Sequence, residues 1–591
     1  MNHQPIRGLG LSPAADPVLA RLRQAGLVEV IDQAGEAGAS LRCHWRESSA
    51  FVVVGACGAV VRLIAPLLSD KALDPAVVVV DPQGRYAVPV LGGHGAGAEA
   101  LSQRIAALLG GEAVLTGACA ASGRLPLDSF GAAWGWKRGQ GDWSGLMKSM
   151  GQGQRLRLRQ ESGSRLWRQS PAALRLDPID IDRSEAAPEL VISHRLGEGL
   201  RWHPPSLWLG LGCERNTSLS LLERAVDHCL QAHGLAAEAV AGLATAERKA
   251  DEPALLALAE RRGWPLRCFA ANELARVDVP NPSAVVEREL GTASVAEAAA
   301  RLAAGAEAQL LVEKRIERSE PGEQGAATVA VALCASQQAP HQGALNLVGS
   351  GPGSLDLLTP DARRALAEAT VWVGYGLYLD LLEPLRRPDQ VRLDGVLTQE
   401  KERCRQALEL AAQGLNVALV SSGDSGIYGM AGLALELWME LPVDGQPSFQ
   451  VHPGISALQL AAARAGAPLM HDFCTISLSD RLTPWPTIEA RLQGAARGDF
   501  VVALYNPRSQ GRQWQLERAR ELLLEGRPAS TPVALARQLG RAEEEVRLSS
   551  LGELPIEEVD MLTLVLVGNS STRVQQGRMV TPRGYPGAVL A

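Results

Sequence analysis

The chain has 591 residues, of which 46% are hydrophobic and only 4% aromatic, and its net charge is −7 at pH 7. This length predicts three to five domains of roughly 100–200 residues each, and the small-residue composition favours α/β layers. Basic residues are dispersed and form no Lys/Arg-rich run, which argues against a nucleic-acid partner.

The nine cysteines are scattered, and no two of them form a Cys-x-x-Cys pair. Because structural zinc and iron–sulfur sites favour clustered cysteines, no metal site is predicted. Such a set is typical of reduced thiols in a cytosolic protein. The first residues contain no apolar signal core, and the longest apolar runs are too short to cross a bilayer. We therefore expect a cytoplasmic protein without a membrane partner.

The first 120 residues predict a small α/β domain, whose clear strand and helix patterning begins near residue 51. Residues 1 to about 45 are weakly patterned, and we expect them to pack loosely. The run FVVVGACGAVVRLIAPLL suggests a strand, a turn and a helix. Further elements are predicted as strands at 77–80, 86–91 and 113–116 and a helix at 98–109.

The middle of the chain divides into an irregular stretch and a second α/β unit. Residues 121–200 contain motifs such as GWKRGQGDW, and we expect short strands with turns there. The unit 201–335 starts at WLGLGCERNTS, where a strand enters a glycine turn and an N-capped helix over 219–233. It ends near a strand at 329–333. The polar segment 336–344 is interpreted as a linker.

The segment 345–591 repeats one pattern, a buried strand followed by a glycine-rich loop and a helix. It occurs in LNLVGSGPGSLDLLT, NVALVSSGDSGIYGMAGLALELW and FQVHPGISALQLAAARAGAPL, and FVVALYNPRS and MLTLVLVGNSSTR add two buried strands. Glycines placed there allow close backbone approach to a ligand at the carboxyl edge of a parallel sheet. The first loop lacks GxGxxG spacing with a following acidic residue, which disfavours a dinucleotide site. We expect two lobes, at about 345–450 and 451–591.

Taken in order, these loops resemble one family. VGSGPGSLDLLT, SSGDSGIYGMA, HPGISALQLAAARAGAPL, HDFCTISLSDRLTPW, LYNPRS and LVGNSS are similar to motifs of the tetrapyrrole methylases, the class III S-adenosylmethionine (SAM)-dependent methyltransferases. The LYNPRS and SLSDRLTPW versions resemble the precorrin-3B C17-methyltransferases of cobalamin biosynthesis. The resemblance covers about 345–575 and implies two α/β lobes with SAM folded between them.

The resemblance also implies which residues contact SAM. They are Pro352, Ser422, Gly423, Asp424, Ile427, Ser456, Ala457, Asn506, Leu539 and Gly540, with Leu539 and Gly540 as alternatives for one backbone contact. SAM is an activated donor, so the protein mainly orients and desolvates the reactants, and no metal or strong nucleophile is needed. From the residues alone, Asp424 is equally well explained as a turn former in SGDSG.

The implied reaction contracts the macrocycle while it methylates C17, which can require a group that handles protons. Candidates near the motif loops are His452, His471, Asp472, Asp480 and Thr483. Each histidine is better explained as an ordinary loop residue, and none is assigned as the base.

In the N-terminal half, isolated residues give weaker signals. His94 lies in the glycine-rich loop GGHGAG, where a structural role is more common than a catalytic one. Lys249, Asp251 and Glu252 precede a helix in KADEP, and a helix cap explains them better than catalysis does.

As a set, the N-terminal motifs resemble CbiG, the cobalt-precorrin-5A hydrolase family, over about 50–335. Its early part is similar to two motifs of this chain, LIAPLLSDKALDPAVVVVD and PVLGGHGAGAEAL. Its C-terminal domain, which is also found alone as the CobE type, is similar to GLGCERNTS, ERKADEPALLALAERRGWPLRCF, VPNPSAVV, GTASVAEAAA and LLVEKR. This family opens a δ-lactone and releases acetaldehyde, which requires an acid/base group and oxyanion stabilisation. His94, Lys249, Asp251 and Glu252 are the catalytic candidates.

The leading hypothesis is a multidomain α/β enzyme, with CbiG-like domains followed by a two-lobed class III methyltransferase, that performs two steps of corrin-ring biosynthesis. Its ligands are SAM and a tetrapyrrole intermediate, with cobalt present only as part of the substrate. The methylase family suggests a homodimer. Two alternatives stay open. The N-terminal half can be a non-catalytic corrinoid-binding module, or the methylase can act at another precorrin position.

Overall fold

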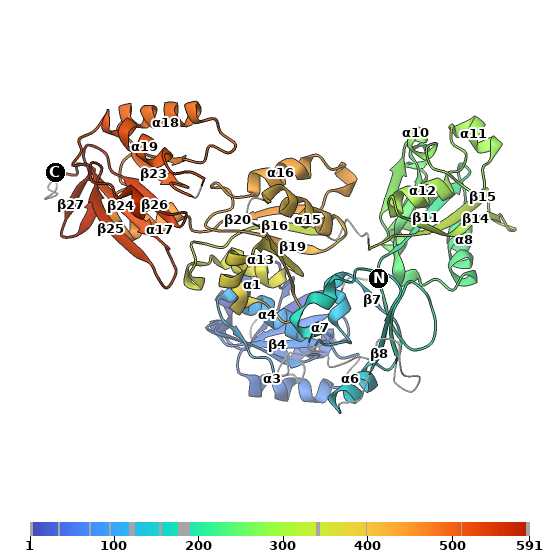
Figure 1. Ribbon diagram of the computed structural model, residues 1–591. Coiled ribbons are helices and arrows are strands. Elements are labelled where there is room, and N and C mark those ends of the chain that lie inside the picture. The colour runs from blue at the N-terminus through green and yellow to red at the C-terminus, as the bar shows by residue number, and fades with distance from the viewer. Residues whose placement is uncertain are drawn as a thin grey trace.

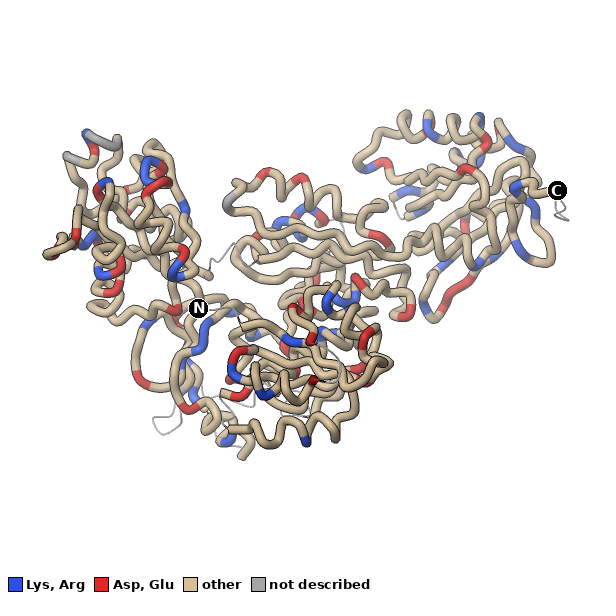
Figure 2. Tube along the Cα trace, turned by 180° about the vertical axis from the view of Figure 1, so that it is seen from behind, with Lys and Arg blue, Asp and Glu red and all other residues tan. Residues whose placement is uncertain are grey.

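The computed structural model describes residues 4–32, 36–69, 73–93, 96–116, 125–152, 156–174, 189–337, 343–396, 399–509 and 511–586. They form five packed units in an elongated arrangement, with the C-terminal lobe at one end and the unit around β11 at the other (Figure 1). None of the helices in these segments combines the length and the apolar composition that a bilayer crossing needs. Acidic and basic residues alternate along the trace of every unit (Figure 2).

The first unit is a six-stranded sheet in the order β2-β1-β3-β4-β5-β6, with α1 and α4 against one face and α2 and α3 against the other. Its elements are β1 Ile6–Gly10, α1 Asp16–Gln24, β2 Val30–Ile31, α2 Ala37–His44, β3 Ala50–Val54, α3 Cys57–Ile64, β4 Ala76–Val80, β5 Tyr86–Leu91, α4 Ala98–Leu109 and β6 Glu112–Ala113. The expectation that this region packs loosely is wrong for residues 4–32 and 36–45, because β1 is an inner strand and Leu9, Leu22 and Leu27 are buried.

The irregular stretch forms a four-stranded sheet in the order β7-β10-β9-β8. Its elements are η3 Phe130–Trp134, β7 Lys137–Arg138, α6 Trp143–Gly151, β8 Arg157–Gln160, η4 Leu166–Gln169, α7 Pro171–Leu174, β9 Glu189–Ile192 and β10 Leu200–His203. The expected short strands are confirmed. Their core is aromatic: the ring of Phe130 lies 5.6, 5.1 and 5.8 Å from those of Trp136, Trp167 and Trp202.

The third unit is a five-stranded sheet in the order β13-β12-β11-β15-β14. β11, β12 and β13 are parallel, and β14 and β15 form an antiparallel pair at one side. Its elements are β11 Leu207–Cys213, α8 Leu219–Ala232, β12 Val240–Ala246, η6 Glu247–Lys249, α9 Pro253–Arg262, β13 Leu266–Phe269, α10 Ala271–Leu274, α11 Ala284–Leu290, α12 Ala296–Ala304, β14 Gln309–Arg318 and β15 Ala326–Leu333.

The C-terminal segment forms two lobes. Lobe 1 is a fully parallel sheet in the order β18-β17-β19-β16-β20. Its elements are β16 Ala344–Gly349, α13 Pro360–Glu368, β17 Val371–Tyr375, α14 Gly376–Leu382, β18 Val391–Gly395, α15 Glu400–Ala412, β19 Asn416–Ser421, α16 Ala431–Met439 and β20 Ser448–His452.

Lobe 2 is a mixed sheet in the order β22-β23-β26-β24-β25, beside a small three-stranded sheet of β21, β28 and β27. Its elements are α17 Ala457–Ala465, β21 Gly466–Ala467, β22 Phe473–Ser477, α18 Trp485–Arg497, β23 Val501–Tyr505, α19 Gln515–Leu524, β24 Pro532–Arg537, β25 Glu545–Ser550, β26 Thr563–Val567, β27 Arg573–Gln575 and β28 Arg578–Val580. β26 is antiparallel to β23 and β24, so its first residues lie at the edge where those two strands end.

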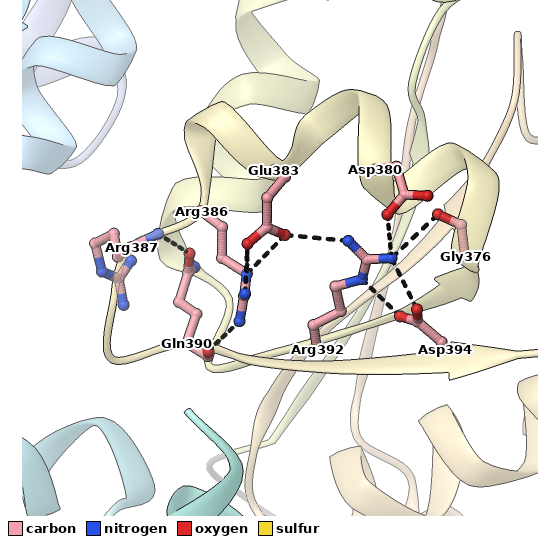
Figure 3. Close-up of polar contacts among 8 residues, drawn as sticks. All are labelled: Gly376, Asp380, Glu383, Arg386, Arg387, Gln390, Arg392 and Asp394. Atoms are coloured by element: carbon pink, nitrogen blue, oxygen red, sulfur yellow. Dashed lines mark hydrogen bonds and ion pairs between the residues drawn. The ribbon is translucent and has the colours of Figure 1, made fainter. Parts of the chain in front are cut away.

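A charged network holds the edge strand of lobe 1. The Arg392 guanidinium on β18 pairs with Asp380 and Asp394 at 2.6 Å and with Glu383 at 3.1 Å, and donates to the carbonyl of Gly376 at 3.2 Å (Figure 3). Arg392 is only 14% exposed. These contacts join β18 to α14 and to the turn that follows it.

The N-terminal half packs directly on lobe 1. Arg104 of α4 pairs with Glu368 of α13 at 3.2 Å, and Thr370 donates to the carbonyl of Ala133 at 2.8 Å. The aromatic core of the four-stranded sheet is continuous with the apolar core under β16, β17 and β19. Gln337, at the start of the expected polar linker, is buried and accepts a hydrogen bond from Trp136 at 2.6 Å. Residues 338–342 of that linker lie outside the described residues, and its last residue, Ala344, begins β16.

Candidate functional site

A cavity of about 190 Å³ lies where the carboxyl ends of the lobe 1 strands face lobe 2. Lobe 1 contributes the loops after β16 and β19 and the start of α14, and lobe 2 the ends of β23 and β24 and the start of β26. The lining residues are Pro352, Tyr378, Ser422, Gly423, Asp424, Ile427, Tyr428, Ser456, Ala457, Tyr505, Asn506, Ala536, Gln538, Leu539, Arg541, Met561, Leu562, Thr563 and Leu564.

Three glycine loops of lobe 1 meet beside this cavity. Gly351 and Gly423 exchange backbone hydrogen bonds of 2.8 and 3.1 Å. A Cβ on Gly454 would lie 2.0 Å from the carbonyl oxygen of Gly423, and one on Gly349 would lie 2.6 Å from the Gly454 nitrogen. Glycine is therefore required here because the loops approach one another, and not only because a ligand approaches them as the sequence suggested.

Asp424 joins two of these loops. Its Oδ1 accepts the N–H of Gly426 at 2.8 Å, and its Oδ2 accepts the N–H of Gly454 at 3.0 Å. The turn-forming role is thus present, while the same residue also lines the cavity. Ser456 begins α17 as a capping box with Gln459, which fixes the neighbouring wall.

Two tyrosines form the wall contributed by both lobes. The ring centroids of Tyr428 and Tyr505 lie 5.1 Å apart. The Tyr505 hydroxyl accepts the N–H of Leu458 at 3.1 Å, which ties β23 to the first turn of α17. Burial raises the pKa of Tyr505 above its usual value, so the phenol stays neutral at physiological pH.

Strained backbone is concentrated at the cavity. Six non-glycine residues of the described chain have clearly positive φ angles, and three of them, Tyr428, Asn506 and Gln538, line the cavity. Their φ angles are 54°, 50° and 49°. Such residues are rare, carry a conformational cost and cluster at functional sites. The geometry therefore marks this cavity as a site by a criterion that is independent of any motif.

The structure brings nine of the ten predicted SAM contacts to this one cavity. The exception is Gly540, whose N–H donates to Glu544 at 2.7 Å and which packs against the backbone of Pro352 and Gly353. That these residues contact SAM stays a prediction. Sequence reasoning missed Tyr378, Tyr428, Tyr505, Gln538 and Arg541 and the start of β26. Tyr505 and Arg541 adjoin predicted residues, whereas β26 has no glycine signal at its beginning.

The proposed proton-handling candidates lie elsewhere. His452 is buried, with its ring nitrogens 2.7 Å from Asp361 and 3.0 Å from Asn346. His471 contacts the carbonyl of Pro582 at 2.9 Å, and Asp480 accepts from Gln515 at 3.0 Å. Neither these three nor Asp472 and Thr483 belong to the described lining of the cavity.

A second polar cluster occupies the third unit, where the parallel strands β11 and β12 end. It contains the predicted residues Lys249, Asp251 and Glu252 together with Arg215 and Asn216 from the other loop. Glu252 is the N-cap residue that immediately precedes α9, as the helix-cap interpretation expects, but its side chain makes no capping hydrogen bond. His94, the fourth predicted residue, lies outside the described residues. Within those residues, no group of three or more His, Cys, Asp and Glu side chains is arranged to hold a metal ion.

Three family models match the chain. The model described as Tetrapyrrole (Corrin/Porphyrin) Methylases matches residues 344–555, Cobalamin synthesis G C-terminus matches 207–332, and Cobalamin synthesis G N-terminal matches 39–119. The cavity between the lobes falls mostly in the first segment, and the second polar cluster falls in the second.

The C-terminal segment is also similar to individual proteins. A Salmonella typhimurium protein named "Probable cobalt-factor III C(17)-methyltransferase" is 50% identical over 241 residues, which are 41% of this chain and 99% of that protein. A Sinorhizobium protein named "Precorrin-3B C(17)-methyltransferase" is 44% identical over 252 residues, 42% of this chain and 98% of that protein. A solved structure titled "Crystal structure of the methyltransferase CobJ" is 41% identical and covers 41% of this chain and all of that chain, with a TM-score of 0.39.

Proposed function

The chain belongs to the tetrapyrrole (corrin/porphyrin) methylase family, and from that premise we propose that its C-terminal lobes transfer a methyl group from SAM to C17 of precorrin-3B or its cobalt-bearing counterpart, with ring contraction. This is a step in cobalamin biosynthesis. The observation that carries the proposal is the cavity between the lobes, which gathers predicted contacts from five separate loops in a segment matching nearly the whole length of two C17-methyltransferases.

The residues of the cavity fit SAM. The Asp424 carboxylate can face an ammonium group, and the rings of Tyr428 and Tyr505 can face a sulfonium cation. The Ser422–Gly423 backbone offers close approach for the rest of the molecule. Bound there, SAM supplies an activated methyl group, so the protein needs neither a metal nor a nucleophile for the transfer.

The chain's own residues then act by positioning. Asp424 holds the loops after β19 and β20 together, and Tyr505 fixes the start of α17. Leu539 and Leu564 are buried and keep water from the inner wall. Holding donor and acceptor in line removes much of the entropic barrier, which is the main contribution available in such a site.

We propose that the acceptor ring binds at the mouth of the cavity. Ile427, Tyr428, Met561 and Leu562 line it and are 37%, 51%, 45% and 40% exposed, an apolar lip contributed by both lobes. A flat tetrapyrrole buries its faces on such a surface while its carboxylates stay in water. Cobalt, where present, enters as part of this substrate.

We further propose that the N-terminal half hydrolyses the δ-lactone of cobalt-precorrin-5A, after which the two-carbon fragment leaves as acetaldehyde. The two cobalamin synthesis G matches and the polar cluster of Lys249, Asp251 and Glu252 support this proposal. The second candidate function, a corrinoid-binding module without catalysis, is separated from it by acetaldehyde release. We propose that the enzyme works in the cytoplasm as a homodimer.

The test of the methylase function uses the whole protein with ¹³C-methyl SAM and cobalt-precorrin-3. We expect the product to gain one methyl group by mass spectrometry and NMR to locate the label at C17. Labelling at a different ring position would contradict the C17 assignment, and transfer to no precorrin would contradict the methylase function.

A further inference from the structure

The N-terminal half contains a buried carboxylate, one oxygen of which accepts no hydrogen bond from the described residues. The Glu252 side chain is only 1% exposed, and its Oε1 accepts the N–H of Asn216 at 2.9 Å. Its Oε2 is buried without a hydrogen-bond partner among the described residues. Leaving such an oxygen unsatisfied destabilises the fold, and more so for a charged group, so its retention calls for a functional explanation.

A second buried carboxylate of the same unit shows the contrast. Glu297 is fully buried, and both of its oxygens are satisfied by Asn281, with a third hydrogen bond from the N–H of Lys314 at 3.0 Å. These contacts fix the loop before α11 to β14. Glu297 is therefore explained by structure alone, whereas Glu252 is not.

Two cations flank the unsatisfied oxygen without bonding to it. The Lys249 Nζ lies 3.8 Å and the Arg215 guanidinium 3.7 Å from Oε2. The Lys249 side chain is 11% exposed and makes no hydrogen bond among the described residues, while Arg215 is 54% exposed. Oε2 is therefore covered in this structure, and Arg215 is the exposed neighbour whose movement would bring a water or substrate oxygen to the carboxylate and the ammonium together.

Backbone strain points to the same place. Asn216 has a φ angle of 57°, one of the few positive values among non-glycine residues of the described chain. This conformation directs its N–H at Glu252. Local strain of this kind is retained where the surrounding structure uses it, which is characteristic of active sites.

The neighbouring thiol does not offer an alternative nucleophile. Cys213 ends β11 next to this cluster, and burial raises its pKa to about 11. The reactive form of cysteine is the thiolate, and at neutral pH almost none is present. The cluster therefore favours activation of water over covalent catalysis by cysteine.

We propose that Glu252 and Lys249 are the catalytic residues of the hydrolytic half and that Arg215 binds a peripheral carboxylate of the tetrapyrrole. This assignment rests on the hydrolase function proposed above. Oε2 of Glu252 takes a proton from water as the water oxygen bonds to the lactone carbonyl carbon, and the Lys249 ammonium stabilises the oxyanion formed. When the ring C–O bond breaks, the departing alkoxide takes that proton from Glu252, so the carboxylate is regenerated. Acetaldehyde leaves in a later step: the new hydroxyl gives up its proton, its oxygen becomes the aldehyde carbonyl as the C–C bond to the macrocycle breaks, and the macrocycle takes up the electron pair of that bond with one proton.

Asp251 has a different role in this assignment. It is 75% exposed and pairs with Arg215 at 2.7 Å, and the second arm of the guanidinium donates to the carbonyl of Arg248 at 2.7 Å. Asp251 is thus a positioning residue for Arg215. Its substitution should alter the affinity for substrate and not the rate of the bound complex.

The test measures acetaldehyde release from cobalt-precorrin-5A by the full-length protein. We expect Glu252→Gln to lower kcat by about 100-fold or more with little change in KM. Arg215→Gln should raise KM about 10-fold with kcat nearly unchanged, and Asp251→Asn should shift KM in the same direction by less. Thermal unfolding of the same samples, compared with the unaltered protein, reports that each variant is folded.

Glu297→Gln is the matched control, because it alters a buried carboxylate of the same unit outside this cluster. It should lower the melting temperature and leave acetaldehyde release per folded molecule unchanged. If Glu252→Gln folds and still releases acetaldehyde at the normal rate, the assignment of Glu252 is overturned while the hydrolase function stands. If the unaltered chain releases none, the hydrolase function is overturned and the assignment with it.

Discussion

Asp424 accepts the backbone N–H of Gly454 at 3.0 Å, so a single carboxylate joins the loop after β19 to the loop after β20. Both loops line the cavity between the lobes. Asp424 therefore shapes the site in the absence of a ligand, and substitution of either partner, Asp424 or Gly454, should disturb it.

Asp424→Ala removes acceptors from two backbone N–H groups and the carboxylate that faces the cavity. We expect SAM affinity to fall by about 10- to 100-fold, the cost of one or two charge-assisted hydrogen bonds. Isothermal titration calorimetry of the whole protein measures it directly. Asp424→Asn, which keeps one acceptor, should lose less. Unchanged affinity in the alanine variant would show that this loop is not the cofactor contact.

Gly454→Ala places a methyl group where the Gly423 carbonyl already lies 2.0 Å from an ideal Cβ. The loops must separate, so we expect SAM binding to weaken by at least about 10-fold and stability to fall by about 1–3 kcal/mol. The control is Gly432→Ala in α16, where a Cβ would meet nothing within 4 Å. That change should be neutral or stabilising by about 0.5–1 kcal/mol. Equal effects of the two changes on SAM binding would contradict the proposed loop packing.

Burial of His194 should make the stability of the N-terminal half sensitive to acid. It is 5% exposed, neither ring nitrogen has a hydrogen-bond partner among the described residues, and burial lowers its pKa from 6.5 to about 4. Between pH 6.5 and about 4, the His194 imidazole is therefore protonated in the unfolded chain and neutral in the folded chain. The stability is present above pH 6.5 and is lost as the pH falls towards 4, by up to about 3 kcal/mol.

Urea unfolding at pH 7 and at pH 5 tests this sign. The unaltered protein should lose more stability between these pH values than His194→Leu, which has no imidazole to protonate. A variant with the same pH dependence as the unaltered protein would remove His194 as the cause.

Arg392→Ala leaves Asp380, Glu383 and Asp394 facing one another without their shared cation (Figure 3). Because these carboxylates are 65%, 43% and 50% exposed, solvent moderates the loss, and we expect about 1–2 kcal/mol of destabilisation. Hydrogen exchange of β18 should accelerate. Arg405→Ala, which breaks one exposed pair of 3.9 Å in the same lobe, should cost at most about 0.5 kcal/mol. Comparable losses would argue against a network effect.

The sequence predicted the elements whose patterning is strong and local. The helix over 98–109 and the strand over 86–91 have the bounds expected for them. Nine of the ten residues that the family resemblance implied as SAM contacts lie around one cavity, and their contact with SAM stays a prediction. β1 was missed because IRGLG has only two large apolar residues, and its burial comes from strands and helices distant in the sequence.

Other features depend on contacts that no local pattern contains. The tryptophans between 134 and 202 become a core only when four short strands bring them together. The left-handed backbone conformations of Tyr428 and Gln538 could not be predicted from their residue types, because glycine is the residue that usually indicates this geometry. The pairing of Arg215 and Asn216 with Glu252 joins loops more than thirty residues apart.

The aromatic core of the four-stranded sheet continues into lobe 1 without a boundary, and Gln337 is fastened inside it by Trp136 and by the carbonyl of Trp134. The polar stretch that separates the two halves in sequence therefore does not mark a boundary between independently packed units. Separating the two halves would expose apolar side chains on each of them, because the four-stranded sheet and lobe 1 share one core. A fragment that begins after this stretch would therefore carry an apolar surface that the whole chain buries.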